Sequence, residues 1–506
     1  MDLALRVPIA DQRPRALLHG DFDGRQRPSF IVNVQKCKLI CYAVMKLLFI
    51  LFFLMVPCLL AKDPVYVVLW FDTEDYVDPI SDDAALRIAN DLTKLNVRAT
   101  FKLVGERARV LEKRNRVDVI RALSHHNIGY HSNWHSVQPV PAVYLKQLGM
   151  LDGEQEFERR ELAGALDVKR IFGVMPICYG QPGSSWAPQT YPALRHMGIP
   201  VYLDDGSQIG LDDQPFWYDG ILTIFNLGQY AIRPDLDHEQ ENPAIYRKFA
   251  ADAGKLADNG GGVISTYFHP TEFVHTEFWD AANFKDGEVR ERSAWVLPHR
   301  RTPAEAERCF RILKEYVEQA QRTPGVQFVT AQDLLQLYRS PIPPPLAKEK
   351  AARYLKQQIT FARTDAGDWS AADLLLAVLG LPPQVVDGPT ARGATTYASA
   401  TIPGWLFERS RKDAISFINA HHRLPSQVFV GAATLSLADF AATAAAQVLS
   451  PGPVLVEHGQ IGFEKYISTD PKGAFSWPIH PKGFAAPELL DLARLQAWTL
   501  KPARFK

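Results

Sequence analysis

Short apolar runs rich in β-branched residues recur along residues 63–337 and alternate with stretches of helical periodicity. Strands that alternate with helices are typical of parallel sheets, and nearly continuous apolar strands are buried on both faces. We therefore expect an α/β fold, a distorted (β/α) barrel, with a doubly wound open sheet as the alternative. The expected strands are residues 65–71, 97–104, 171–175, 199–203, 221–227, 263–268 and 326–330.

The pattern changes after residue 337. Residues 338–347 include Ser-Pro-Ile-Pro-Pro-Pro, which cannot continue a helix and favours an extended linker. Residues 348–506 are expected to form a smaller, mostly helical domain of unknown role, with envelope-glycan binding as one hypothesis. Ser370 and Ser436 each precede an expected helix start. Tryptophans of this part that could hold a glycan or lie in its core are Trp369, Trp405, Trp477 and Trp498.

A hydrophobic segment near the N-terminus predicts export. Residues 47–56 form an unbroken apolar run in the layout of a signal peptide. A spanning helix needs about 20 apolar residues, and this run is shorter. We interpret residues 45–61 as a signal peptide or membrane anchor and residues 1–44 as a mis-called or disordered extension. If the upstream residues are made, residues 39–60 are the alternative anchor, and both versions place the body of the protein outside the cytoplasm, secreted or in the cell envelope.

The composition argues against two classes of protein. Lys plus Arg and Asp plus Glu number 56 each, so the excess of positive charge that a nucleic-acid partner requires is missing. The chain has five cysteines, too scattered for a disulfide scaffold or a four-cysteine zinc site. Any metal must therefore be held by other residues.

A histidine pair, a run of acids and a third histidine could carry chemistry, and the acids and the third histidine follow expected strands, where the catalytic groups of a barrel gather. His131 and His135 are four apart, a spacing that can direct both imidazoles to the same side of one helical turn. Residues 72–75, Asp-Thr-Glu-Asp, follow the first strand and can add an acid to form a set of metal ligands, although a solvated acidic turn is the alternative. His269 follows a later strand and is placed like a general acid, or it bonds a neighbouring loop.

These pieces, in this order, resemble the polysaccharide deacetylase family, also called NodB-homology or carbohydrate esterase family 4. Residues 71–75, Phe-Asp-Thr-Glu-Asp, are similar to its first motif. Residues 98–105, Arg-Ala-Thr-Phe-Lys-Leu-Val-Gly, resemble its second strand, usually Ala-Thr-Phe-Phe followed by an apolar residue and Gly. Residues 129–135 match its His-Ser/Thr-x-x-His motif, and residues 268–270, Phe-His-Pro, resemble its closing motif. The resemblance covers residues 63–337.

The resemblance implies a NodB-type barrel and a metal-dependent deacetylase that hydrolyses the N-acetyl amide of an amino sugar in an extracellular or cell-envelope polysaccharide. A divalent metal, usually zinc in this family, is then held by His131, His135 and an acid of the first motif. Asp72 takes a proton from the attacking water, and His269 donates one to the leaving amine.

Two departures from the family pattern leave alternatives open. The first motif commonly has adjacent aspartates, and here we favour Glu74 as the metal ligand because residues two apart on a strand face the same way, with Asp75 as the alternative. The third motif normally carries an arginine that pairs with the catalytic aspartate, where this chain has Gln181. A neutral amide can orient Asp72 but cannot supply charge. A hydrolase of a non-sugar amide and a catalytically decayed glycan-binding protein therefore remain as alternatives.

Further residues are expected to support the site. Asp204 lies where the family often has another acidic contact. Trp186 and Trp134 lie on other loops and could face a sugar, although burial is the commoner fate of such side chains. A candidate sugar-stacking wall around the closing motif consists of Phe268, Phe273, Phe278, Trp279 and Phe284.

Overall fold

The computed structural model describes residues 63–506. The predictions made for residues 1–44, 45–61 and 39–60 lie outside the described residues. No helix within residues 63–506 is long and apolar enough to cross a membrane.

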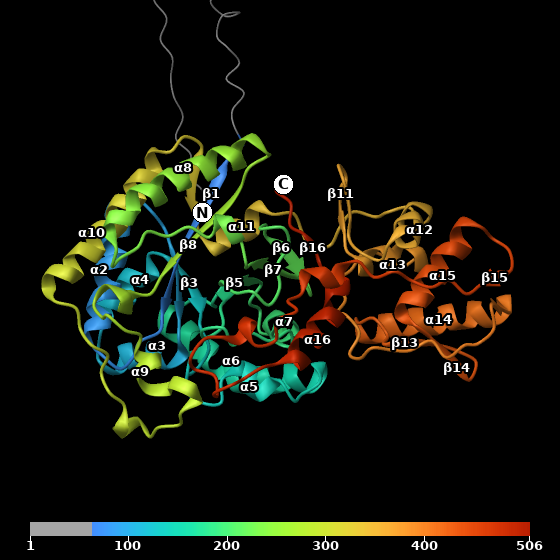
Figure 1. Cartoon of the computed structure of the whole chain (residues 1–506), viewed down its shortest axis with the longest axis horizontal. Coiled ribbons are helices and arrows are strands. Elements are labelled where there is room, and N and C mark those ends of the chain that lie inside the picture. Colours follow the sequence, from blue (N-terminus) through green and yellow to red (C-terminus); the bar gives the residue numbers. More distant parts are fainter. Residues whose placement is uncertain (1–62) are drawn as a thin grey trace, which may run out of the picture. The chain divides into compact units, whose positions relative to one another are not determined.

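A ten-stranded, mostly parallel sheet combines nine strands of the first part of the described chain with β16 (Lys501–Pro502) from its end (Figure 1). The antiparallel pairs are the two at one edge, and all the others are parallel. In pairing order the strands are β16 (Lys501–Pro502), β6 (Phe216–Tyr218), β7 (Ile221–Ile224), β5 (Val201–Leu203), β4 (Cys178–Tyr179), β3 (Asn127–Tyr130), β2 (Thr100–Leu103), β1 (Val65–Thr73) and β8 (Gly262–Phe268), and β9 (Val326–Val329) pairs with the first half of β1.

The ends of this path, β8 and β16, do not pair with each other within residues 63–506, so the barrel is distorted and not closed by a complete ring of strand pairs. The expected α/β class and distorted barrel are confirmed. β1 lies deep in the sheet, and all nine of its residues are buried. Its nearly continuous apolar sequence suits this position, because each fully buried Val, Leu or Phe contributes about 1.5–3 kcal/mol.

Helices cover the sheet, and α10 illustrates why they form. Thr302 caps it by accepting the amide of Glu305, whose side chain bonds back to the Thr302 amide. Its buried residues recur every three or four positions from Cys309 to Ala320, which makes one apolar stripe toward the core. The helices of this part are α2 (Ile80–Lys94), α3 (Gly105–Lys113), α4 (Val117–Ser124), α5 (Pro141–Leu145), α6 (Met150–Phe172), α7 (Thr190–His196), α8 (Asn242–Asp258), α9 (Trp279–Phe284), α10 (Pro303–Arg322) and α11 (Ala331–Leu337).

One expected strand is wrong. Residues 171–175 do not form a strand, because α6 continues through Phe172 and ends at Gly173, which adopts the left-handed conformation at φ 77°. Of the apolar residues of this segment, Phe172 belongs to the buried stripe of α6, whereas Val174 lies beyond the helix and is exposed. The short strand β4 follows instead, and it pairs with β3 and β5.

In the part of the chain after residue 347 most of the regular structure is helix, with three small strand pairs and β16, which joins the large sheet. Ser370 and Ser436 are confirmed as helix caps, since their side chains accept the amides of Asp373 and Asp439. The proposed boundary at residues 338–347 stays a prediction. The elements are α12 (Lys348–Gln357), α13 (Ala371–Leu379), α14 (Gly404–His421), α15 (Leu437–Leu449), α16 (Pro487–Gln496) and the paired strands β10 (Ala362–Thr364) with β11 (Gly367–Trp369), β12 (Thr401–Ile402) with β15 (Val454–Leu455), and β13 (Gln427–Val430) with β14 (Ala433–Ser436).

Candidate active site

The carboxyl ends of several parallel strands surround one cavity of about 360 Å³. Asp72 and Glu74 come from the end of β1, His131 from the end of β3, Asp204 from the end of β5 and His269 from the end of β8. In a barrel, the side chains at the carboxyl ends of the strands face one shared opening, however far apart they are in the sequence. The structure therefore brings together residues that lie up to 197 positions apart.

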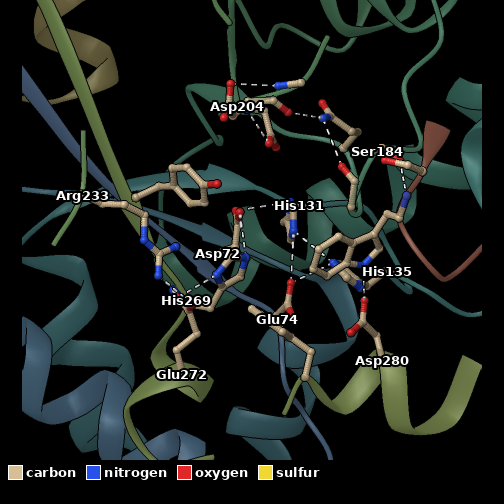
Figure 2. A pocket seen from close by; sticks show the side chains of 18 residues that line it. Asp72, Glu74, His131, His135, Ser184, Asp204, Arg233, His269, Glu272 and Asp280 are labelled. Atoms are coloured by element: carbon tan, nitrogen blue, oxygen red, sulfur yellow. Dashed lines mark hydrogen bonds and ion pairs between the residues drawn. The ribbon is translucent and has the colours of Figure 1, made fainter. Parts of the chain in front are cut away.

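Glu74, His131 and His135 converge on a single point, as Figure 2 shows. The His135 Nε2 atom lies 2.9 Å from the Glu74 carboxylate and 3.1 Å from His131 Nε2. The His131 Nε2 atom lies 3.5 Å from the same carboxylate oxygen. All three side chains are buried.

The hydrogen bonds of the two imidazoles fit a cation at this point. His131 Nδ1 faces the Gly180 carbonyl at 3.0 Å, and a carbonyl only accepts, so Nδ1 carries the proton and Nε2 keeps its lone pair. Two imidazole nitrogens and a carboxylate oxygen that meet at 2.9–3.5 Å repel one another unless a proton or a cation lies between them. Tetrahedral zinc ligands are separated by about 3.3 Å, given metal–ligand distances of about 2.0–2.1 Å.

Burial shifts the pKa values of this cluster in opposite directions. It lowers the pKa of His131 well below its ordinary value and raises that of Glu74. Burial also lowers the pKa of His135, but the Glu74 carboxylate outweighs it and the net pKa is raised. Since neutral imidazole and ionised carboxylate are the forms that bind metal, a divalent ion would replace the proton that His135 and Glu74 otherwise share.

The local backbone that places the histidines differs from the expected one. His131 and His135 do not lie on a helical turn, but in a tight loop after β3 in which Ser132 and His135 have φ of 62° and 55°. The Ser132 hydroxyl accepts the backbone amide of His135 at 2.8 Å, which closes the loop. The four-residue spacing thus gives convergence through a loop, and the helical interpretation is wrong.

A residue not anticipated from the sequence, Lys102, holds Asp72. Its ammonium lies 2.9 Å from Asp72 Oδ1 and 2.7 Å from Asp204 Oδ2, and it donates to the Leu203 carbonyl at 2.8 Å. β1 and β2 pair with Asp72 directly opposite Lys102, which sets this contact. Burial lowers the pKa of Lys102, but the Asp204 and Asp72 carboxylates outweigh it and raise the net pKa, so the ammonium stays charged.

Two glycines leave room for this lysine. A Cβ on Gly129 would lie 2.8 Å from Lys102 Cγ, and one on Gly180 would lie closer still to both the ammonium and Asp204. The sequence did carry a signal, because a lysine inside the apolar run Thr-Phe-Lys-Leu must find a carboxylate when that strand is buried.

Three of the proposed site residues have other partners. Gln181 accepts the Tyr202 hydroxyl and donates to the carbonyls of Gly183 and Asp205, so the prediction that its amide orients Asp72 is wrong. Asp75 is not in the metal-ligand cluster, because its carboxylate accepts the Val77 and Asp78 amides and the Ser81 hydroxyl. Trp186 does not line the cavity and donates to the Tyr191 hydroxyl.

His269 is oriented by an acid and an arginine. Its Nδ1 lies 3.0 Å from Glu272, whose other oxygen accepts from Arg233 at 2.7 Å, and its Nε2 lies 3.5 Å from Asp72 Oδ2. Burial lowers the pKa of His269, but Glu272 outweighs it and raises the pKa to about 9. Nδ1 donates to Glu272, and the protonated ring presents Nε2–H to the cavity.

The aromatic wall is smaller than expected. Phe278 lines the cavity, but the other four residues of the candidate wall are core residues with exposed fractions of 1% or less. Trp134 is 44% exposed beneath the Arg109 guanidinium. Two further aromatic side chains line the cavity, Tyr267 and Trp477, and Trp477 packs edge-on against Phe278 with ring centroids 5.5 Å apart.

Comparison with known proteins gives matches among solved structures only. No family model matches the chain, and neither does any curated protein. The chain resembles polysaccharide deacetylases of known structure. The peptidoglycan deacetylase PdaC from Bacillus subtilis is 14% identical, with 55% of this chain and 92% of that chain covered and a TM-score of 0.28.

Two further structures show how broad this likeness is. A mutant of a carbohydrate esterase family 4 pseudoenzyme is 12% identical, over 54% of this chain and 68% of that chain, with a TM-score of 0.29. A 4-alpha-glucanotransferase from Thermococcus litoralis is also 12% identical, over 58% of this chain and 44% of that chain, with a TM-score of 0.35. Because TM-scores this low carry no argument about activity, the function must follow from the residues of the site.

Proposed function

We propose that this chain is a metal-dependent hydrolase that removes the acetyl group from an N-acetylated amino sugar of an extracellular or cell-envelope polysaccharide. The observation that carries the proposal is the convergence of Glu74, His131 and His135 beside Asp72 and His269 in one cavity. Export rests on the sequence of residues 45–61.

Glu74, His131 and His135 would hold the divalent ion, which we propose to be zinc. When bound, the ion polarises an amide carbonyl and lowers the pKa of water. Asp72 is poised to receive a proton from that water, because Lys102 holds Oδ1 and leaves Oδ2 directed to His269 and the cavity. Lys102 supplies the positive charge that Gln181 lacks, and this argues against a decayed site.

His269 is the complementary acid. Its pKa of about 9 keeps it protonated at neutral pH, and its Nε2–H can pass to the amide nitrogen as the carbon–nitrogen bond breaks. The oxygen of the water becomes part of the carboxylate product. One proton of the water, taken up by Asp72, replaces the proton that His269 donates. The other proton completes the protonated amine. Phe278 and Trp477 offer aromatic faces or edges to the apolar side of a pyranose ring.

Metal analysis and acetate release test the proposal together. The purified protein should retain about one divalent ion per chain and release acetate from N-acetylglucosamine oligomers or peptidoglycan. His131→Ala should lose both, whereas His421→Ala, which removes an exposed histidine of α14, should lose neither. A metal-free, inactive protein would reject the proposal, and hydrolysis confined to non-sugar amides would reject its substrate class.

A further inference from the structure

The two metal-facing imidazoles are oriented by different means. His131 donates directly to the Gly180 backbone carbonyl. His135 instead contacts the Ser136 hydroxyl, with 2.7 Å between Nδ1 and Oγ. A hydroxyl can donate or accept, so the direction of this bond depends on which group receives the Ser136 hydroxyl proton.

Asp280 decides that direction. The Ser136 hydroxyl donates to Asp280 Oδ2 at 3.2 Å, and this carboxylate can only accept when it is ionised. Ser136 Oγ must then accept from His135 Nδ1–H, which leaves the Nε2 lone pair directed to Glu74 and His131. Ser136 and Asp280 are both buried, with exposed fractions of 0% and 1%, and Asp280 reaches the surface only at the wall of the cavity.

The Asp280 carboxylate is itself held by a residue from far along the chain. Its Oδ1 accepts the Ala281 amide at 2.7 Å, and its Oδ2 accepts the Trp477 indole N–H at 3.0 Å. The carboxylate lies beside His135 in Figure 2. Trp477 is thus the last member of a chain of hydrogen bonds that runs through Asp280 and Ser136 to His135.

Trp477 is in turn fixed against the barrel. Its backbone amide donates to the Ser184 hydroxyl at 2.9 Å, and its ring packs on Phe278. Its ring lies where a Cβ on Gly183 would be, only 2.2 Å from the indole Cδ1. Close by, the Ile479 carbonyl accepts from Gln138 at 2.7 Å. The indole N–H therefore reaches Asp280 from a well-packed position.

We infer that Trp477, through Asp280 and Ser136, is a positioning residue of the metal centre: it fixes the tautomer and ring orientation of His135. This inference rests on the proposed metal site. Partners in the outer shell of a metal typically change its affinity by about 10–100-fold when removed. The part of the chain after residue 347 then contributes to the strength of metal binding as well as to the wall of the cavity.

Zinc affinity of the full-length chain, measured by competition with a chromophoric chelator, tests the inference without relying on activity. Trp477→Phe keeps the aromatic packing and removes the N–H, and should weaken Zn²⁺ binding about 10-fold. Ser136→Ala should weaken it at least as much, and Ser136→Thr, which keeps the hydroxyl, should restore most of the affinity.

Trp295→Phe is the matched control. Its indole N–H donates to the Arg290 carbonyl at 3.1 Å, in the neighbouring aromatic cluster but outside this chain of bonds, so Zn²⁺ affinity should not change. Unchanged Zn²⁺ affinity in a folded Trp477→Phe variant would overturn the role of Trp477, and unchanged affinity in Ser136→Ala would overturn the whole chain of bonds. If Trp477→Phe does not fold, the Ser136→Ala and Ser136→Thr pair decides. Failure of the unmodified protein to bind Zn²⁺ would instead reject the proposed function itself.

Discussion

The two halves of the site treat buried charge in opposite ways. Around Asp72 and His269 the fold provides its own ions, because Lys102 lies against Asp72, and Arg233 against Glu272. Around Glu74 the ion-pair partners within residues 63–506 are His131 and His135, both of which are acceptors at Nε2 when neutral. A buried carboxylate without a fixed cation is costly. The difference separates two kinds of carboxylate: Asp72, a proton acceptor that the protein pairs with its own lysine, and Glu74, which is left to bind an external cation.

Replacing the carboxylate of each half by the matching amide should give the largest difference between the two halves of the site. Glu74→Gln removes a metal ligand and should abolish both bound metal and acetate release, with activity at least about 1000-fold lower. Asp72→Asn should lower acetate release by a similar factor but keep the metal, since Asp72 faces Lys102. Elemental analysis alongside the activity assay measures both. Metal lost equally from the two variants would contradict the division.

Removing the internal cation should destabilise the fold. Lys102→Met leaves Asp72 and Asp204 buried side by side, at a cost of about 3–5 kcal/mol in the free energy of unfolding. Burial already raises the pKa of Asp204 to about 7. When a carboxyl has a raised pKa in the folded state, the folded protein becomes less stable as the pH rises and that carboxyl ionises. The deficit, measured by urea unfolding, should therefore be larger at pH 8 than at pH 5.

A surface lysine provides the control for that measurement. Lys94→Met removes an exposed ion pair with Asp91 and should barely move the urea midpoint at either pH. Equal effects of the two substitutions would mean that Lys102 is not the buried counterion that its contacts indicate.

The carboxylate behind His269 should set the alkaline limb of the pH–rate profile. His269 donates a proton only below its pKa of about 9, which Glu272 raises. Glu272→Gln should lower that pKa, so that kcat/KM begins to fall at a pH about 1–2 units lower and is about 2- to 10-fold smaller at pH 8. An alkaline limb that does not move would show that another group supplies the proton.

The smallest effects should distinguish the cavity wall from the core behind it. Phe278→Leu removes an aromatic face of the cavity and should raise KM about 3- to 10-fold with a smaller change in kcat. Trp186→Phe lies outside the cavity and should change neither constant more than about twofold. Steady-state kinetics on a soluble oligomer measures both, and the reverse order would refute the assignment of the wall.

Patterns local in the sequence predicted most of the framework. The apolar runs predicted β1, β2, β5, β7, β8 and β9, since burial on both faces requires a continuous apolar sequence, but not the short strands β3, β4 and β6. The segment at residues 171–175 failed because α6 continues through Phe172. The acids after β1 and His269 were singled out because they follow expected strands, and the histidine pair because of its four-residue spacing. Gln181 was assigned to Asp72 from its place in a motif, although its amide hydrogen-bonds loop groups instead.

What the sequence by itself determined is therefore six of the ten strands of the large sheet and the chemistry at their carboxyl ends, because both depend on residue type and short-range periodicity. Only the tertiary structure decided which polar groups meet: the Lys102 ammonium with Asp72 across two paired strands, and the Trp477 indole N–H with Asp280 across 197 residues. Such contacts follow from strand register and loop packing, and neither is written in the local pattern of residues. They also determine which carboxylate is held by the protein and which is left to a metal ion.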